Sequence, residues 1–255
     1  MTEPSGLLPP RVAVLGFARS GRALTSALLD RGVEVSVGDR RPEGELGEAV
    51  SPMRERGVRF FLGEFPPEKL LDGAGWLALS PGVPSSAPIP RAARSRGIPV
   101  LAELEIAWRI AQKEAEGENR WVAVTGTNGK STTTAWIAEL LRRAGRRVAL
   151  AGNIGVPVSS FLDDRSARDF VCEVSSFQLE TISRFRGDVA VVTNVTPDHL
   201  DRHGTFEAYA RAKARVFENQ RKSDFAVVNI DDEGSASLTG GGRRIPFSRH
   251  GVPEG

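Results

Sequence analysis

The sequence predicts an α/β protein made of two consecutive parallel-sheet blocks. Short apolar runs alternate with helix-like runs along most of the 255 residues, and the first apolar run of each block leads through a glycine-containing turn into a helix-like run. Such alternation is typical of parallel strands joined by crossover helices. The length suffices for two domains or for one large one, and we place two domains at residues 1–116 and 117–255.

The first block extends to about residue 115 and contains five short apolar runs. Its predicted elements are strand 12–15, helix 22–31, strand 33–37, strands 59–62, 76–79 and 99–101, and helix 103–115. The second strand ends at Asp39. The polar stretch 114–120 is the best linker between the blocks.

The second block begins at Trp121 and repeats the alternation. Its predicted strands are 121–124, 148–150, 170–174, 189–193 and 225–229, and its clearest helices are 133–144 and 206–219. After Asp232 the pattern collapses into Gly240–Gly242 and a tail.

The composition excludes several classes of protein. Apolar residues make up 40% and charged residues 26% of the chain, and the formal net charge is only +2, with no basic stripe of the kind that binds nucleic acid. The single cysteine, Cys172, lies in an apolar strand and is expected to be a buried structural thiol in a reducing compartment. No signal peptide and no run of 18 apolar residues is present, so we expect a cytoplasmic monomer without membrane insertion.

The turn after strand 121–124 has the layout of a phosphate-binding loop. Its glycines allow backbone N–H groups to close around phosphate oxygens, and the following helix N-terminus adds positive potential. Lys130 is predicted to reach the terminal phosphates, and a hydroxyl of Ser131 or Thr132 to contact Mg²⁺. Val124 stands where the full P-loop pattern has a glycine. The predicted residues for a nucleoside triphosphate in this P-loop-type domain are Gly126, Thr127, Asn128, Gly129, Lys130, Ser131 and Thr132.

The turn at residues 16–21 resembles a dinucleotide fingerprint of a Rossmann-like domain. Gly16 and Gly21 match, but Ala18 replaces the central glycine, so the motif alone is a weak signal. Asp39 is placed to meet a ribose or a base edge, and its alternative role is to cap the turn after its strand. A nucleotide diphosphate is the preferred ligand, and a nicotinamide cofactor remains the alternative.

Three further segments carry residues suited to chemistry. Glu173 ends a predicted strand, where a carboxylate can bind Mg²⁺ or can instead cap the next helix. The loop 194–203 contains His199 and His203, two of the three histidines, together with Asp198 and Asp201, and this combination favours a site. Lys213 lies in a helical run, and its residue type alone favours an exposed side chain.

These segments resemble the Mur ligases, through residues 125–132, 152–155, 173–180 and 194–202. The phosphate loop is shared across this superfamily, whereas residues 152–155 and 175–180 resemble the members that add D-glutamate to UDP-N-acetylmuramoyl-L-alanine. The resemblance implies that ATP phosphorylates a carboxylate, and that an amine attacks the acyl phosphate to form an amide. It identifies the second block as an incomplete Mur ligase central domain, and implies that the D-glutamate site and part of the adenine site lie beyond Gly255.

The resemblance also implies roles for single residues. Lys130, His199 and Lys213 would be catalytic, and Mg²⁺ would be held by Ser131, Glu173, His199 and a carbamylated Lys213. The substrate side would be formed by Gly16, Ser20, Gly21, Asp39, Arg40, Ser80, Gly82, Asn153 and Ser176, with Asp39 and Arg40 near the uracil. The alternatives are another Mur ligase, a folylpolyglutamate synthase, or a truncated module that binds nucleotide without turnover.

Overall fold

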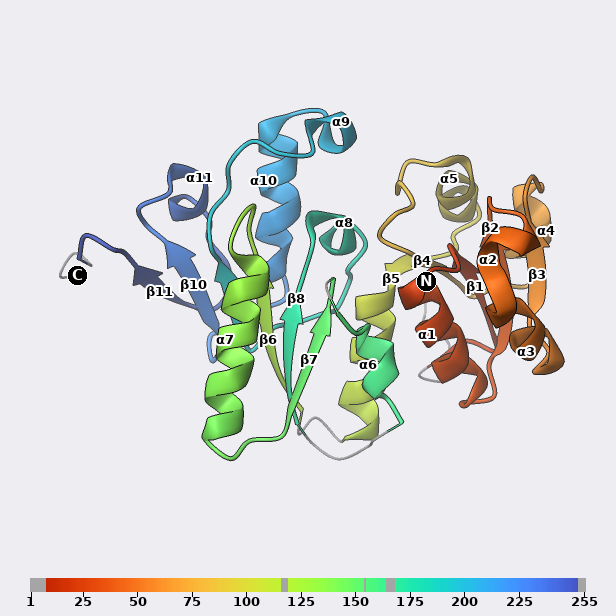
Figure 1. Ribbon diagram of the computed structural model, residues 1–255. Coiled ribbons are helices and arrows are strands. Elements are labelled where there is room, and N and C mark those ends of the chain that lie inside the picture. Colours follow the sequence, from red (N-terminus) through yellow and green to blue (C-terminus); the bar gives the residue numbers. More distant parts are fainter. Residues whose placement is uncertain (1–7, 116–118, 154, 164–167, 252–255) are drawn as a thin grey trace.

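The computed structural model describes residues 8–115, 119–153, 155–163 and 168–251. Two parallel β-sheets stand side by side, each flanked by helices (Figure 1). Two predictions fall partly outside the described residues. The predicted domain boundary at residues 116 and 117, within the predicted linker 114–120, is not described, and neither is Ile154 of the segment 152–155.

The first domain is a five-stranded sheet with the order β3-β2-β1-β4-β5. Its strands are β1 (Arg11–Leu15), β2 (Glu34–Asp39), β3 (Arg59–Leu62), β4 (Trp76–Leu79) and β5 (Val100–Ala102). Its helices are α1 (Arg19–Leu29), α2 (Glu43–Leu46), α3 (Val50–Glu55), α4 (Pro67–Leu71), α5 (Pro88–Ser95) and α6 (Glu103–Glu114), with a 3₁₀ turn η1 (Gly47–Ala49). The strand order reverses between β1 and β4, and the carboxyl ends of strands at such a reversal form a ligand crevice.

The second domain is a six-stranded sheet with the order β11-β10-β9-β6-β8-β7. Its strands are β6 (Arg120–Thr125), β7 (Val148–Gly152), β8 (Asp169–Glu173), β9 (Val189–Val192), β10 (Phe225–Asn229) and β11 (Arg243–Phe247). Its helices are α7 (Lys130–Arg143), α8 (Ser176–Leu179), α9 (Leu200–His203), α10 (Phe206–Ala214) and α11 (Glu233–Ala236), and its 3₁₀ turns are η2 (Val158–Phe161) and η3 (Arg215–Phe217). The pairings are parallel in both sheets, as predicted.

The expected loss of regular structure after Asp232 is wrong. Helix α11 follows at once, and β11 pairs in parallel with β10. Pro246 lies within β11. Because β11 is the edge strand of the sheet, no further strand needs a hydrogen bond from the backbone nitrogen that proline lacks. The predicted helix 206–219 is also shorter than expected, since α10 ends at Ala214 and continues as the 3₁₀ turn η3.

One cluster of buried apolar residues extends through both domains, and a second lies within the first domain. Trp121 at the start of β6 stacks on Phe170 of β8 with ring centroids 4.1 Å apart, and helices α1 and α6 contact η2 of the second domain. Arg31 donates to both carboxylate oxygens of Glu114 at 2.7 Å and to the carbonyl of Leu162 at 2.8 Å. This packing also brings the loop after β7 close to the start of α1. Arg19, the first residue of α1, donates to the carbonyl of Gly155 in that loop at 2.8 Å.

Among the described helices, none combines the length and apolar character needed to cross a bilayer.

Candidate active site

The predicted phosphate loop joins β6 to α7. Gly126 has a φ of 144° and Gly129 a φ of 80°, so both occupy backbone conformations that side chains disfavour. Gly129 is the N-cap of α7, and Ser131 and Thr132 in the first turn are exposed. The free N–H groups of a long helix therefore face solvent beside two hydroxyls, which suits an anion.

The loop after β9 fixes the shape of the phosphate loop. Asn194 accepts from the N–H of Asn128 at 2.9 Å and donates to the carbonyl of Asn128 at 3.0 Å. The hydroxyl of Thr193 donates to that same carbonyl at 2.7 Å, and the N–H of Thr127 donates to the carbonyl of Asn194 at 2.9 Å. Sequence reasoning gave Thr193 and Asn194 no role, although their position after an apolar strand beside β6 is the signal that could have found it.

Two lysine side chains approach the phosphate loop from different elements. Lys130 donates to the carbonyl of Thr127 at 2.8 Å, and Lys213 of α10 donates to the carbonyl of Gly126 at 2.6 Å. Lys213 is only 2% exposed, and its ammonium lies 4.5 Å from the ring centroid of Tyr209. The interpretation of Lys213 as an exposed helix lysine is therefore wrong, because α10 packs this side chain against the loop.

Burial and, to a smaller extent, the nearby charge of Lys130 lower the pKa of the Lys213 ammonium to about 7, although Asp198 and Glu173 act in the opposite direction. At neutral pH a substantial fraction of this amine is therefore unprotonated and nucleophilic.

Glu173 is buried at the end of β8. One of its carboxylate oxygens accepts from the Asn153 side chain at 3.1 Å, and the other, Oε2, is buried without a hydrogen-bond partner in the described part of the chain. The alternative role of Glu173 as a helix cap is wrong, since Ser175 caps α8 and forms a capping box with Gln178. A buried carboxylate oxygen without a donor is suited to a cation.

The predicted metal ligands do not form a protein-only cluster. Within the described ranges no group of three or more His, Cys, Asp or Glu side chains could hold a metal ion. His199 is the N-cap of α9 with a φ of 50°, and its ring centroid lies 5.1 Å from that of Phe177. Mg²⁺ usually takes one or two carboxylates together with phosphate oxygens and water, so a three-ligand protein cluster is not required.

Ser176 contacts a histidine to which the sequence assigned no separate role. Its hydroxyl lies 3.0 Å from His203 Nε2, and His203 Nδ1 lies 3.4 Å from the carboxylate of Glu180. The His203 ring stacks on Phe177, and burial lowers the pKa of its imidazole. The loop 194–203 thus folds back onto α8 through His203, and His199 remains half exposed.

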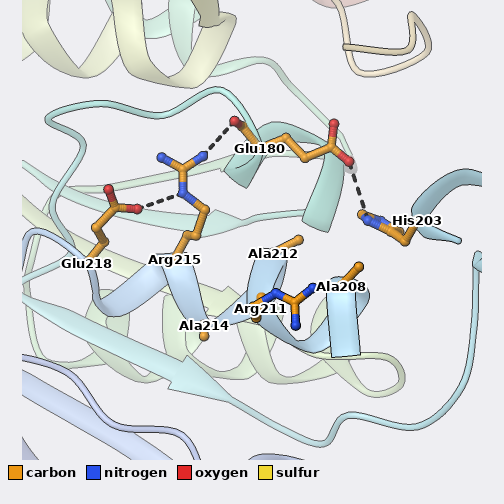
Figure 2. Close-up of a pocket in the computed structure, with 8 residues that line it drawn as sticks. All are labelled: Glu180, His203, Ala208, Arg211, Ala212, Ala214, Arg215 and Glu218. Atoms are coloured by element: carbon orange, nitrogen blue, oxygen red, sulfur yellow. Dashed lines mark hydrogen bonds and ion pairs between the residues drawn. The ribbon is translucent and has the colours of Figure 1, made fainter. Parts of the chain in front are cut away.

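A hollow of about 600 Å³ lies beside this contact, between α8, α9 and α10. Figure 2 shows Glu180, Arg215 and Glu218 along it, with Arg211 and the alanines of α10 opposite.

The crevice of the first domain is a cavity of about 940 Å³ at the reversal of strand order. Six of the predicted substrate residues line it, namely Gly16, Ser20, Asp39, Arg40, Ser80 and Gly82. Gly21 does not line it. Instead, a Cβ at Gly21 would lie 2.0 Å from the carbonyl oxygen of Gly16, so this glycine permits close packing of the turn on α1.

Asp39 is held by hydrogen bonds within the protein. It accepts from the N–H of Phe17 at 2.7 Å, from the N–H of Arg41 at 3.0 Å and from the Arg41 guanidinium at 2.8 Å. Burial acts to raise the pKa of this carboxyl, but the hydrogen bonds from Arg41 and Phe17 outweigh it and lower the pKa to about 2. Asp39 does cap the turn after β2, and Arg41, which sequence reasoning missed, lines the crevice beside it.

The free energy of unfolding of an Asp39→Asn variant is expected to depend less on pH in the acid range than that of wild type. The folded-state pKa of Asp39 lies below its ordinary value, so its stabilisation is present above pH 3.8 and is lost as the pH falls toward about 2. Over that range wild type should lose more stability than the variant in urea unfolding monitored by fluorescence. Asp30→Asn, which breaks an exposed ion pair with Arg56, is the control and should keep the wild-type acid dependence. Parallel curves for wild type and Asp39→Asn would contradict the assignment.

Fold and site together define a two-domain α/β protein with a glycine loop at a helix N-terminus in the second domain and a crevice of about 940 Å³ in the first. Residues 10–102 match the family described as Mur ligase MurD-like, N-terminal domain, and residues 124–245 match the Mur ligase middle domain. The chain belongs to the Mur ligase family. The match of residues 10–102 favours a Mur ligase over a folylpolyglutamate synthase for the chain, and over a nicotinamide-binding domain for the first block.

Two individual proteins illustrate this relationship. The chain is 42% identical over 247 residues to a UDP-N-acetylmuramoylalanine–D-glutamate ligase of Caldanaerobacter subterraneus subsp. tengcongensis, covering 96% of this chain and 53% of that protein. It is 42% identical over 227 residues to the ligase of the same name from Koribacter versatilis, covering 88% and 48%. The chain spans about half the length of these curated relatives.

The structure also resembles UDP-N-acetylmuramate:L-alanyl-gamma-D-glutamyl-meso-diaminopimelate ligase from Neisseria meningitides. The TM-score is 0.60 at 17% identity, over 93% of this chain and 77% of that one, which shows a shared fold.

Proposed function

We propose that this chain carries the UDP-substrate and ATP-phosphate sites of an ATP-dependent ligase that adds D-glutamate to UDP-N-acetylmuramoyl-L-alanine in peptidoglycan synthesis. The observation that carries the proposal is the convergence of Lys130 and buried Lys213 on one glycine loop at a helix N-terminus. The 42% identity to ligases of this specificity indicates the substrate class. Because ATP is consumed, we place the reaction in the cytoplasm.

In this proposal the residues from Gly126 to Thr132 hold the ATP phosphates. The backbone of the loop is fixed by Asn194, so its N–H groups need little rearrangement when phosphate binds. Lys130 is released from the Thr127 carbonyl to neutralise the terminal phosphates. Phosphoryl transfer to a carboxylate brings two anions together, so fixed positive charge at this position lowers the barrier to acyl phosphate formation.

The residues around Glu173 fit a magnesium ion. Glu173 offers a buried carboxylate oxygen without a donor, and Ser131 offers an exposed hydroxyl at the start of α7. Ser131, Glu173, His199 and a carbamylated Lys213 would hold the ion together with phosphate and water, and the ion would neutralise phosphate charge. Carbamylation requires an unprotonated amine, and the lowered pKa of Lys213 supports that requirement.

The crevice of the first domain would hold the UDP part of the substrate. Gly16 lies in the turn before α1 and Ser20 in its first turn, where the diphosphate would meet backbone N–H groups. Asp39 and Arg40 line the same crevice, and the uracil would be bound beside them. Asn153 and Ser176 would face the muramoyl-alanine part. The contact between Arg19 and Gly155 brings these two regions together.

The test is to measure binding and turnover on the same purified chain. Calorimetry with Mg²⁺ should show binding of ATP and of UDP-N-acetylmuramoyl-L-alanine. D-glutamate is then added, and phosphate release measures whether this chain turns over. Binding of both ligands without phosphate release supports a module that binds without turnover. Turnover with meso-diaminopimelate or L-lysine in place of D-glutamate indicates a sibling ligase. Absence of binding by either nucleotide contradicts the proposal.

A further inference from the structure

The hollow shown in Figure 2 is crossed by a guanidinium that binds the backbone of α8. Arg215 of η3 donates to the carbonyls of Leu179 at 2.7 Å, Glu180 at 2.6 Å and Ile182 at 2.8 Å. Its remaining Nε donates to Glu218 at 2.6 Å. Leu179 is the last residue of α8, Glu180 is its C-cap and Ile182 lies two residues further on, so Arg215 binds the C-terminal end of that helix and the segment that follows it.

A carboxylate from the first domain binds the next residues of the same segment. Glu105, in the first turn of α6, is fully buried and accepts from the N–H groups of Ser183 at 2.9 Å, Arg184 at 2.9 Å and Phe185 at 2.7 Å. Its side chain also accepts from Arg109 at 2.7 Å. The N–H of Ala102, just before α6, donates to the carbonyl of Thr181 at 3.1 Å. The segment 179–185 is therefore bound by Arg215 through its carbonyls and by Glu105 through its N–H groups.

This segment connects two parts of the proposed active site. It directly follows α8, which carries Ser176, and Arg215 is two residues after Lys213 on the continuation of α10. The orientation of α8 relative to α10 determines where Ser176 lies with respect to the phosphate loop. Buried charged groups with several fixed hydrogen bonds hold such an arrangement more rigidly than apolar packing alone.

We propose that Glu105 and Arg215 are positioning residues that fix α8, and with it Ser176, relative to α10 for recognition of the muramoyl-alanine part of the substrate. This inference rests on the proposed function. Glu105 also ties α8 to the end of the first-domain sheet, so the UDP crevice and Ser176 keep a constant separation. Of the charged groups that line the hollow in Figure 2, Arg215 provides this bracing and is itself held by Glu218, and the carboxylate of Glu180 contacts His203.

The first measurement reads the position of α8 without any ligand. The chain has three histidines, so the imidazole NMR signals can be assigned by single substitutions. His203 contacts Ser176, Phe177 and Glu180 on α8 and its C-cap, and its signal should shift in Arg215→Lys and Glu105→Gln variants. A lysine lacks the planar fork that reaches three carbonyls. Glu218→Gln, which leaves those three hydrogen bonds in place, should keep the wild-type signal.

The second measurement compares two ligands that differ only in the part recognised near Ser176. In wild type UDP-N-acetylmuramoyl-L-alanine should bind more tightly than UDP, and in Arg215→Lys this preference should fall about tenfold, as expected for loss of one well-placed hydrogen bond. Affinity for UDP should not change. Arg215→Lys retains a cation at a partly exposed position, so it is the variant to use if Glu105→Gln does not fold.

An unshifted His203 signal in Arg215→Lys overturns the proposal. A shifted signal with an unchanged ligand preference also overturns it, because α8 would then not position Ser176 for the substrate. If wild type itself shows no preference for the muramoyl ligand, the proposed function fails, and the His203 signal alone decides whether Arg215 and Glu105 fix α8.

Discussion

Replacement of Gly126 by alanine is expected to abolish ATP binding by this chain. The φ of Gly126 is 144°, and a Cβ there would lie 2.0 Å from Thr193 Oγ1 and within 3.2 Å of the Asn194 backbone. Thr193 and Asn194 are the residues that hold the Asn128 carbonyl, so the added methyl group would displace the support of the loop. Steric crowding of this kind costs about 1–3 kcal/mol, and the resulting loop would no longer present its N–H groups to phosphate.

Calorimetric titration with ATP and Mg²⁺ measures the effect, and we expect a loss of affinity of at least about 100-fold, as for disruption of a preorganised site. Gly145→Ala is the matched control. Its φ of 77° is also positive, but an added Cβ meets no atom within 4 Å, so stability should fall slightly while ATP affinity stays at the wild-type value. Wild-type affinity in Gly126→Ala would show that the loop does not bind the phosphates.

Replacement of Lys213 by methionine is expected to change how stability depends on pH. In the folded protein the pKa of Lys213 is lowered from 10.5 to about 7, so between these values the unfolded chain binds a proton that the folded chain does not. Wild-type stability should therefore rise with pH from about 7 to 10.5, and the methionine variant should lack this rise. Since one pKa unit corresponds to about 1.4 kcal/mol, the variant should be more stable by a few kcal/mol at pH 7.

Urea unfolding of both proteins across this pH range measures the difference. Lys222→Met removes an exposed lysine and serves as the control, with a pH dependence like that of wild type. A wild-type curve that does not rise relative to Lys213→Met would contradict the burial of a neutral amine. Incubation with ¹³C-labelled bicarbonate should also produce a carbamate NMR signal that is missing from Lys213→Met, and a signal retained in that variant would place carbamylation elsewhere.

Much of the fold could be predicted because parallel strands buried on both faces are short apolar runs. The predicted bounds of β3, β4 and β10 coincide with those in the structure. β11 was missed because its sequence, with Arg243, Arg244 and Pro246, has the composition of an edge rather than of a buried strand. Its place is decided by pairing with β10, and local residue preference does not contain that information.

The candidate site also combines features that could be predicted from the sequence with features that depend on the fold. The glycine turn between β6 and α7 could be predicted because Gly126 and Gly129 meet conformational demands that are local to the turn, as their φ values confirm. The hydrogen bonds that hold this loop in place could not be predicted. Asn194 lies 66 residues from Asn128 in the sequence and reaches it only because β9 pairs with β6. Arg41 was missed for a different reason, because the choice between Arg40 and Arg41 as partner of Asp39 depends on side-chain direction.

The sequence by itself determined the two parallel-sheet blocks, the phosphate loop and, through resemblance, the family, because each of these is written in contiguous residues. Only the tertiary structure decided that Lys213 is buried, that one oxygen of Glu173 has no donor, and that Glu105 and Arg215 bind the same segment from two sides. Burial, desolvation and long-range hydrogen bonds depend on which elements pack together. They give otherwise ordinary charged residues of α6, α10 and η3 the properties on which the proposed chemistry depends.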